Sequence, residues 1–282
     1  MKDSSCAQKD QAYGSALGPN WSSDLTLRGS SIKKVHVEYK TNLKEIISGN
    51  DRPLSDIKNK SKKDVEKTGN ITSKQWPVYV ALDNGKIYGC DLVVSATGVT
   101  PNIELFKNEP GLHIAEDGGL VVDSNMRTTL PDVYAAGDVC TPSWCSHSPY
   151  WHQMRLWSQA RQMGTFSARC MVAHLIDKED IPLDFCFDLF SHVTSFFGYK
   201  VILLGKYNCQ GLGDDYELLV RCTDGQEYIK VILHNGKMYG AMLIGETDLE
   251  ETFENLILNQ LDLSSFGEAL LDPDIDIEDY FD

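Results

Sequence analysis

The sequence predicts an α/β fold followed by a smaller α+β domain. Two short apolar stretches, Leu92–Ala96 and Val133–Ala136, are predicted as strands that each end in a turn of small residues. Helical periodicity then runs from about Tyr150 to Ile176. Beyond Ile181-Pro182, strand-like stretches alternate with Asp-Gly and Asn-Gly turns, which is typical of an antiparallel sheet.

The chain is acidic, but its charge is unevenly distributed. The formal net charge is −15, yet residues 1–75 hold 14 Lys and Arg against 9 Asp and Glu, while the remainder holds 12 against 32. An acidic body argues against direct nucleic-acid binding by that part of the chain. The lysine-rich stretch Lys58–Lys67 is consistent with contact to an anionic partner and with a solvated loop.

Length, segment composition and cysteine content are those of an ordinary globular protein. At 282 residues the chain has room for about two domains. We expect no transmembrane helix, because no apolar run reaches about 18 residues, and no secretory signal, because Met1–Asp10 lacks an apolar core. These features favour the cytoplasm or the nucleus, where most of the 8 cysteines would be free thiols.

The first part of the chain alternates between polar and strand-like segments. Residues 1–30 are predicted to be irregular, and Ser31–Tyr39 alternates as a half-buried strand does. Residues 43–75 are polar and lysine-rich and are predicted to form a mobile insertion. Next, Pro77–Asp83 and the segment from Lys86 flank Asn84-Gly85, the strongest short signal for a β-hairpin.

The chain is organised around the stretch Thr129–Asp138. Strand Val133–Ala136 is predicted to end at Gly137-Asp138, where the glycine lets the backbone turn sharply and approach a ligand. A carboxylate at the end of such a strand can accept hydrogen bonds from a chain of hydroxyl groups. Taken alone, the stretch is better explained as a plain strand that ends in a Gly-Asp turn.

A second stretch upstream has the same construction. Asp91–Asn102 is predicted to contain the buried strand Leu92–Ala96 and a flexible turn at Ala96-Thr97-Gly98. Together and in this order, the two stretches resemble the two late signatures of the FAD- and NAD(P)H-dependent pyridine nucleotide-disulphide oxidoreductases. The resemblance covers roughly Ile32 to Leu271, with a gap near residues 43–75.

The resemblance implies a partial flavoprotein fold with two dinucleotide-binding domains. The first stretch would be the crossover from the NAD domain to the FAD domain, and Asp138 would hold the ribityl chain of FAD. The implied cofactor-binding residues are Ala96, Thr97, Gly98, Gly137, Asp138 and Val139. The implied domains are a remnant of the NAD domain (1–95), the C-terminal part of the FAD domain (96–182), an α+β dimerisation-like domain (183–271) and an acidic tail (272–282).

The glycine-rich phosphate cradles of the family are missing from the sequence. The nearest candidate, Gly211-Leu-Gly213, lacks the third glycine and leads into a strand. We therefore expect the chain to be the C-terminal part of a longer protein, as a short isoform or a fragment.

The predicted helix from Tyr150 to Ile176 follows the second signature. Its predicted inner face consists of Met154, Trp157, Ala160, Met163 (or Gly164), Ser167 and Met171. In the family this helix directs its N-terminus at the flavin ring, where its free N–H groups would stabilise a reduced anionic flavin. The residues alone are equally consistent with a buried amphipathic helix.

Candidates for redox or proton transfer are few. Cys140 and Cys145 are separated by four residues just after Asp138, and His152 (like His147) lies near the predicted helix start. The thiols are either a redox pair or plain cysteines, and the histidine is either a proton donor or a capping residue. No Cys and His spacing is that of a zinc site, so no metal is expected.

The C-terminal domain is predicted as a sheet with one helix. The predicted strands are Tyr199–Leu204, Tyr216–Val220, Glu227–Leu233 and Lys237–Ile244. Asp224-Gly225 and Asn235-Gly236 are predicted hairpin turns between them. A helix is predicted to run to about Gln260, with Thr247 or Asp248 as its N-cap.

Two functions from different classes fit these features. The first is an FAD-dependent oxidoreductase that passes electrons from NAD(P)H through flavin to a disulphide, quinone, oxygen or small carrier. The second is a non-catalytic module whose C-terminal domain binds a partner or a second copy, as a homodimer. The sequence leaves open the electron acceptor, the choice between NADH and NADPH, and the physiological partner.

Overall fold

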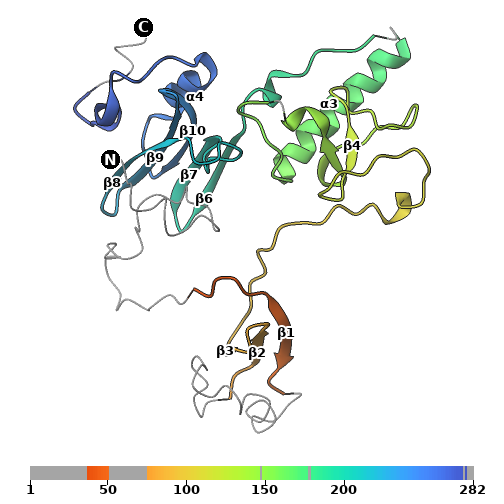
Figure 1. Cartoon of the computed structure of the whole chain (residues 1–282), viewed down its shortest axis with the longest axis horizontal. Helices are drawn as coiled ribbons and strands as arrows, with labels where there is room; N and C mark the ends of the chain where they lie inside the picture. Colours follow the sequence, from red (N-terminus) through yellow and green to blue (C-terminus); the bar gives the residue numbers. More distant parts are fainter. Residues whose placement is uncertain (1–36, 51–74, 147, 177–178, 276, 278–282) are drawn as a thin grey trace. The chain divides into compact units, whose positions relative to one another are not determined.

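The computed structural model describes residues 37–50, 75–146, 148–176, 179–275 and 277. The chain divides into two compact units, Ser30–Gly98 and a larger unit that contains Val99–Asp282 (Figure 1). The boundary falls at Gly98, inside the predicted crossover stretch. No helix in the described ranges is long and apolar enough to span a membrane.

The smaller unit is a three-stranded antiparallel sheet in the order β1-β2-β3. Its strands are β1 (Leu43–Ser48), β2 (Val78–Leu82) and β3 (Ile87–Cys90). The predicted hairpin at Asn84-Gly85 is confirmed, because β2 pairs with β3 and Gly85 has a φ of +87°. The core of this unit consists of Tyr79, Ile47 and Ile87, with Trp76 and Ala81 packed against them.

One sequence-based expectation for this unit is wrong, and a second is contradicted over its described residues only. The predicted insertion at 43–75 contains strand β1, which has only Ile47 buried and is fixed by its pairing with β2. Of the predicted strand Ser31–Tyr39, residues 37–39 are described and form no strand, and the rest lies outside the described residues. Residues 51–74 of the predicted insertion also lie outside the described residues.

The predicted buried strand Leu92–Ala96 is also wrong. Residues 92–96 are exposed and belong to no strand. An apolar strand is buried only where neighbouring strands and helices cover both of its faces. No strand among the described residues pairs with this stretch, so its apolar pattern does not produce a strand here.

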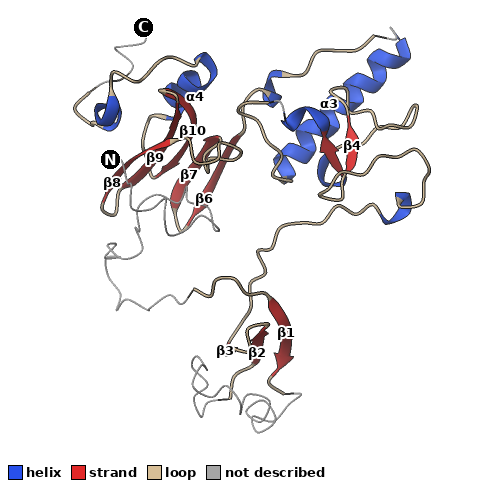
Figure 2. Cartoon of the chain, in the orientation of Figure 1, coloured by secondary structure: helices blue, strands red, loops and turns tan. Residues whose placement is uncertain are grey.

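The larger unit begins with a small α/β layer. Strands β4 (Leu120–Val122) and β5 (Cys140–Pro142) pair in parallel, and helix α3 (Trp157–Ile176) packs beside them (Figure 2). Val133–Ala136 is not the strand that the sequence predicted, because only Tyr134 makes an isolated bridge, to Arg127. The strand lies after Asp138 instead, as β5.

Helix α3 begins at Trp157, seven residues later than predicted. Its buried residues are Gln159, Met163, Phe166, Ser167 and Cys170. Only Met163 and Ser167 of the predicted inner face are buried, and Trp157 is 79% exposed. The predicted inner face was wrong because the true buried face includes the polar Gln159. A hydrophobic pattern does not detect a buried polar residue.

The second part of the larger unit is a five-stranded antiparallel sheet in the order β6-β7-β10-β9-β8. Its strands are β6 (Ser191–Phe196), β7 (Tyr199–Gly205), β8 (Glu217–Thr223), β9 (Glu227–His234) and β10 (Lys237–Ile244). Helix α4 (Glu250–Asn259) packs on it through Phe253, Leu256 and Ile257. The four predicted strands are confirmed as β7 to β10, whereas β6 was not predicted.

The start of α4 differs from the prediction in one respect. Leu249 occupies the N-cap and makes no side-chain cap bond, so neither Thr247 nor Asp248 caps the helix. Glu250 and Glu251 lie in the first turn, where negative charge is favourable. The predicted turn Asn235-Gly236 joins β9 to β10, with φ values of +52° and +72°.

Candidate functional site

The centre of the candidate site is the 3₁₀ turn Gly137–Val139, which packs against the first turn of α3. Gly137 is buried and has a φ of +80°, a conformation that favours glycine. A Cβ atom at this position would lie 3.1 Å from the Cβ of Ala160. The glycine therefore permits both the bend of the turn and its close contact with the helix.

The Asp138 side chain lies at the surface of this turn. It is exposed, and its carboxylate has no hydrogen-bond or ion-pair partner among the residues that the structure describes. Its own backbone carbonyl oxygen, in contrast, accepts a hydrogen bond of 3.2 Å from Nε of Arg155. The backbone of Asp138 is thus held in place while its carboxylate stays available to a ligand.

Arg155 connects this turn to a second one at Asp117-Gly118-Gly119. Its Nη2 donates to Oδ2 of Asp117 at 2.6 Å and to Oγ1 of Thr141 at 3.2 Å. Thr141 donates to Oδ1 of Asp117 at 2.7 Å, and the backbone N–H of Gly119 donates to the same oxygen at 3.1 Å. These groups form one connected network around the Asp138 turn.

The network sets the charge state of Asp117. Desolvation on burial is the largest single effect and raises the pKa of this carboxyl group. Together, the hydrogen bonds from Thr141, Arg155 and Gly119 lower the pKa more than burial raises it. The pKa of Asp117 therefore lies below its ordinary value of 3.8. Asp117 therefore stays ionised at neutral pH and pairs with Arg155.

Two glutamines shape the segment between the turn and α3. Gln153 donates from Nε2 to the carbonyl oxygens of Gly137 and Cys140, both at 3.1 Å. Gln159, which is buried, accepts from the backbone N–H of Met154 at 2.8 Å and donates to the carbonyl of His152 at 2.9 Å. Side chains thus take the hydrogen bonds that a helical backbone would make here, which explains why α3 does not begin at Tyr150.

The two thiol candidates differ in what the structure describes. Cys140 is fully buried, and its Sγ donates to the carbonyl oxygen of Gly137 at 3.4 Å. This contact supports the turn that carries Asp138. The backbone of Cys145 lies in the 3₁₀ turn Ser143–Ser146, and its side chain lies outside the described residues.

The His152 ring is half-buried in the larger unit. It stacks on Phe190 with a centroid distance of 4.2 Å, and its Nε2 lies 3.3 Å from Nε2 of Gln210. Burial first, and the charge of Lys206 second, lower the pKa of His152 to about 4. The imidazole is therefore neutral at pH 7 and holds no imidazolium proton to donate. His147 lies outside the described residues.

The predicted cofactor residues divide between the two units. Ala96, Thr97 and Gly98 are exposed residues of the smaller unit. Gly98 has a φ of +77°, and a Cβ atom there would meet nothing within 4 Å. Gly137, Asp138 and Val139 belong to the larger unit, where the network of Arg155 holds them.

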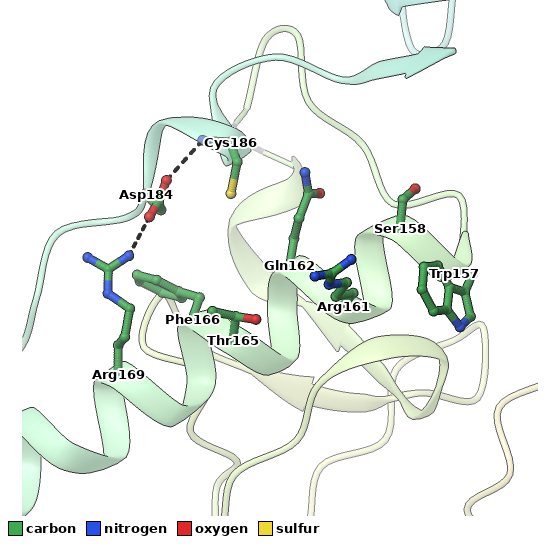
Figure 3. A pocket seen from close by; sticks show the side chains of 9 residues that line it. All are labelled: Trp157, Ser158, Arg161, Gln162, Thr165, Phe166, Arg169, Asp184 and Cys186. Atoms are coloured by element: carbon green, nitrogen blue, oxygen red, sulfur yellow. Dashed lines mark hydrogen bonds and ion pairs between the residues drawn. The ribbon is translucent and has the colours of Figure 1, made fainter. Parts of the chain in front are cut away.

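A shallow groove of about 420 Å³ lies along α3 (Figure 3). One wall is the ion pair between Arg169 and Asp184, whose nitrogen and oxygen are 2.5 Å apart, and the exposed indole of Trp157 lies at the other end. None of the predicted site residues lines this groove. No group of three or more potential metal ligands occurs among the described residues.

Comparison with known proteins shows which class of protein the chain resembles. Residues 33–164 match the family described as pyridine nucleotide-disulphide oxidoreductase. The whole chain is similar to pyridine nucleotide-disulfide oxidoreductase domain-containing protein 1, with 58% identity to the protein of Rattus norvegicus and 56% to that of Homo sapiens. In these comparisons the chain resembles the pyridine nucleotide-disulphide oxidoreductase family.

The matches cover all of this chain but only part of each relative. The alignments cover 100% of this chain but 57% of the rat protein and 56% of the human protein, so the chain spans little more than half the length of these relatives. Among solved structures, the NAD-dependent persulfide reductase from A. fulgidus matches with a TM-score of 0.52 and 22% identity, over 72% of this chain and 38% of that one. This likeness shows the fold, a partial flavoprotein α/β fold.

Proposed function

We propose that this chain carries the ribityl-binding part of the FAD site in an oxidoreductase that uses NAD(P)H. The single observation that carries the proposal is the exposed carboxylate of Asp138, which has no partner among the described residues and lies on a turn whose backbone Arg155 holds. A carboxylate accepts hydrogen bonds from ribityl hydroxyls, and bonds to a charged group contribute about 1.5–3 kcal/mol each.

The described residues fit this part of the cofactor. Gly137 has no side chain to block the approach to α3, and Asp138 supplies acceptors without donors. FAD, when bound, would accept a hydride from the nicotinamide and pass electrons onward. The work of this chain would be to orient that cofactor: Asp138 by hydrogen bonding, Arg155 and Gln153 by fixing the turn.

For the electron acceptor we propose a chemical class and no particular compound. A stretch of 74 residues is 43% identical to the NAD(P)H sulfur oxidoreductase (CoA-dependent) of Pyrococcus furiosus, which supports a sulfur compound as one candidate. The thiol of Cys140 is buried against Gly137, which favours an acceptor that does not require a redox dithiol at this position. A quinone, oxygen or a small carrier fits that condition.

The test is an FAD titration followed by quenching of flavin fluorescence, with this chain and with a full-length relative that carries the same variants. Asp138→Ala is expected to weaken FAD affinity at least about tenfold, because the ribityl hydroxyls lose their acceptor. Asp188→Ala is the matched control, since Asp188 is also an exposed carboxylate and follows a different 3₁₀ turn, Phe185–Phe187. Equal FAD affinity of Asp138→Ala and the control removes the assignment.

The alternative function, a partner-binding module, is favoured by a different observation. The hairpin between β6 and β7 exposes aromatic side chains that no described residue covers. This surface does not depend on the flavin proposal.

A further inference from the structure

The turn between β6 and β7 forms an exposed aromatic tip. We define the aromatic hairpin as Phe196, Phe197, Gly198 and Tyr199. Phe197 is 88% exposed, Phe196 is 65% exposed and Tyr199 is 43% exposed. The two phenylalanine rings lie edge to face with centroids 4.5 Å apart. Two aromatic side chains in edge-to-face contact at a hairpin tip expose apolar surface that no described residue covers.

The backbone of this turn disfavours phenylalanine. Phe197 has a φ of +49° and Gly198 a φ of +84°, and Phe196 pairs with Tyr199 across the turn. Such two-residue turns favour Asn-Gly, because both central residues need positive φ. The turn Asn235-Gly236 of the same sheet follows that rule, with φ values of +52° and +72°. At position 197 the chain instead places a bulky residue that is strained and faces solvent.

A strained residue with no buried contacts points to a role outside folding. The Phe197 ring touches Phe196, and both are exposed, so neither ring contributes to the core of the sheet. Strand β6 is also an edge strand and carries no lysine, proline or inward charge that would block pairing. These features together are typical of a docking surface.

The surroundings of the hairpin define the charge of its partner. Lys200, next to the tip, pairs with Glu250, and the negative charges of Glu246 and Asp248 also act on it. The backbone N–H of Gly245 bonds to the carbonyl of Lys200 at 2.9 Å, so the segment that carries these acids lies beside the hairpin. Lys200 is neutralised by one carboxylate, and two exposed carboxylates remain at the rim.

This acidic rim selects among possible occupants. A second copy of the chain would bring two acidic rims together across a symmetry axis, and each copy has a net charge of −15. A membrane with anionic lipids would repel the same rim. A protein with an apolar pocket surrounded by lysine or arginine would match both the aromatic tip and the rim.

We propose that the aromatic hairpin is a docking site for a protein partner that presents an apolar pocket rimmed by lysine or arginine. The inserted group is the Phe196-Phe197 pair, and Glu246 and Asp248 pair with the basic rim. The site lies on the antiparallel sheet and does not rest on the proposed flavin function.

The probe is a synthetic amphipathic helix of leucine and lysine, compared with a helix of the same pattern built from leucine and glutamate. Binding is measured by fluorescence anisotropy with the whole chain. Phe197→Asn is expected to lower the affinity for the lysine helix at least about tenfold and to keep or raise the melting temperature, because asparagine suits this turn. Phe185→Ser is the control, since Phe185 is equally exposed elsewhere on the larger unit.

A second variant tests the charge of the rim without touching the turn. Glu246→Gln combined with Asp248→Asn is expected to weaken binding of the lysine helix and to reduce its dependence on salt. The glutamate helix is expected not to bind. FAD affinity is expected to stay unchanged in all three variants, so the failure of this proposal and that of the flavin proposal are distinguishable.

Four outcomes would overturn the proposal. They are equal binding of the two helices, unchanged binding in Phe197→Asn, a dimer in sedimentation that this variant abolishes, and binding to phosphatidylcholine vesicles that this variant abolishes. The third outcome would assign the hairpin to a second copy, and the fourth to a membrane surface.

Discussion

Arg155 donates from Nε to the backbone carbonyl oxygen of Asp138 at 3.2 Å, while its Nη2 binds the carboxylate of Asp117 at 2.6 Å. One planar guanidinium thus joins two turns that are distant in the sequence. The Arg155 side chain is only 15% exposed, so water competes weakly for these bonds. The position of the free carboxylate of Asp138 therefore depends on a residue that touches only its backbone.

The first prediction follows from this geometry. Arg155→Lys keeps the charge, but a single ammonium cannot reproduce the planar fork that reaches Asp138, Asp117 and Thr141 together. FAD affinity is expected to fall about three- to tenfold, because the Asp138 carboxylate is less well oriented. The measurement is the fluorescence titration used for Asp138→Ala.

The matched control for this prediction is Arg161→Lys. Arg161 is exposed on α3 and lines the groove in Figure 3, and among the described residues it makes no hydrogen bond to the Asp138 turn. It is expected to titrate like the unmodified chain. If Arg155→Lys also titrates like the unmodified chain, the positioning role of Arg155 is wrong.

The second prediction concerns the contact between Gly137 and α3. In Gly137→Ala, a new methyl group would lie 3.1 Å from the Cβ of Ala160, at a backbone φ of +80° that alanine disfavours. The free energy of unfolding is expected to fall by about 1–3 kcal/mol, and FAD affinity is expected to fall with it. Urea unfolding followed by tryptophan fluorescence measures the first effect.

Gly164 supplies the control on the same helix. It lies inside α3, and a Cβ atom there would meet nothing within 4 Å. Gly164→Ala is expected to stabilise the chain by about 0.5–1 kcal/mol, because alanine favours a helix more than glycine does. Destabilisation of similar size in both variants would mean that the close contact of Gly137 is not the cause.

Local chemistry explains what the sequence alone could predict. Asn84-Gly85 and Asn235-Gly236 specify their own turns, so the hairpins were predicted correctly. The Gly137-Asp138 turn was located for the same reason, since only glycine suits its backbone. The fold class follows from these signals together with the apolar periodicity of β7 to β10.

Long-range contacts explain what the sequence alone could not predict. Leu92–Ala96 has a strand pattern, but no strand among the described residues covers it, so pattern alone misleads. Arg155 and Gln159 were missed because their roles consist of bonds from side chains to distant backbone atoms. The sequence signal that could have identified Gln159 was a polar residue within an apolar helix face. Strand β6 was missed because an exposed edge strand needs no apolar alternation.

The third prediction concerns the half-buried imidazole of His152. Burial first and Lys206 second lower the pKa of this group to about 4, whereas an unfolded histidine titrates near 6.5. Between these two values the unfolded chain binds a proton that the folded chain does not, so folding stability falls as the pH drops from about 6.5 to about 4. The loss through this group alone is expected to reach about 3 kcal/mol.

Urea unfolding at a series of pH values measures this loss by difference. His152→Gln removes the titrating group, so its stability is expected to change less steeply than that of the unmodified chain between pH 6.5 and pH 4. His174→Gln, at the C-terminal end of α3 and 42% exposed, is expected to keep the steeper profile. The carboxylates that also titrate in this range are the same in every variant, so they cancel in the comparison. Parallel profiles for His152→Gln and the unmodified chain would show that folding does not shift the pKa of the imidazole, and the prediction would be wrong.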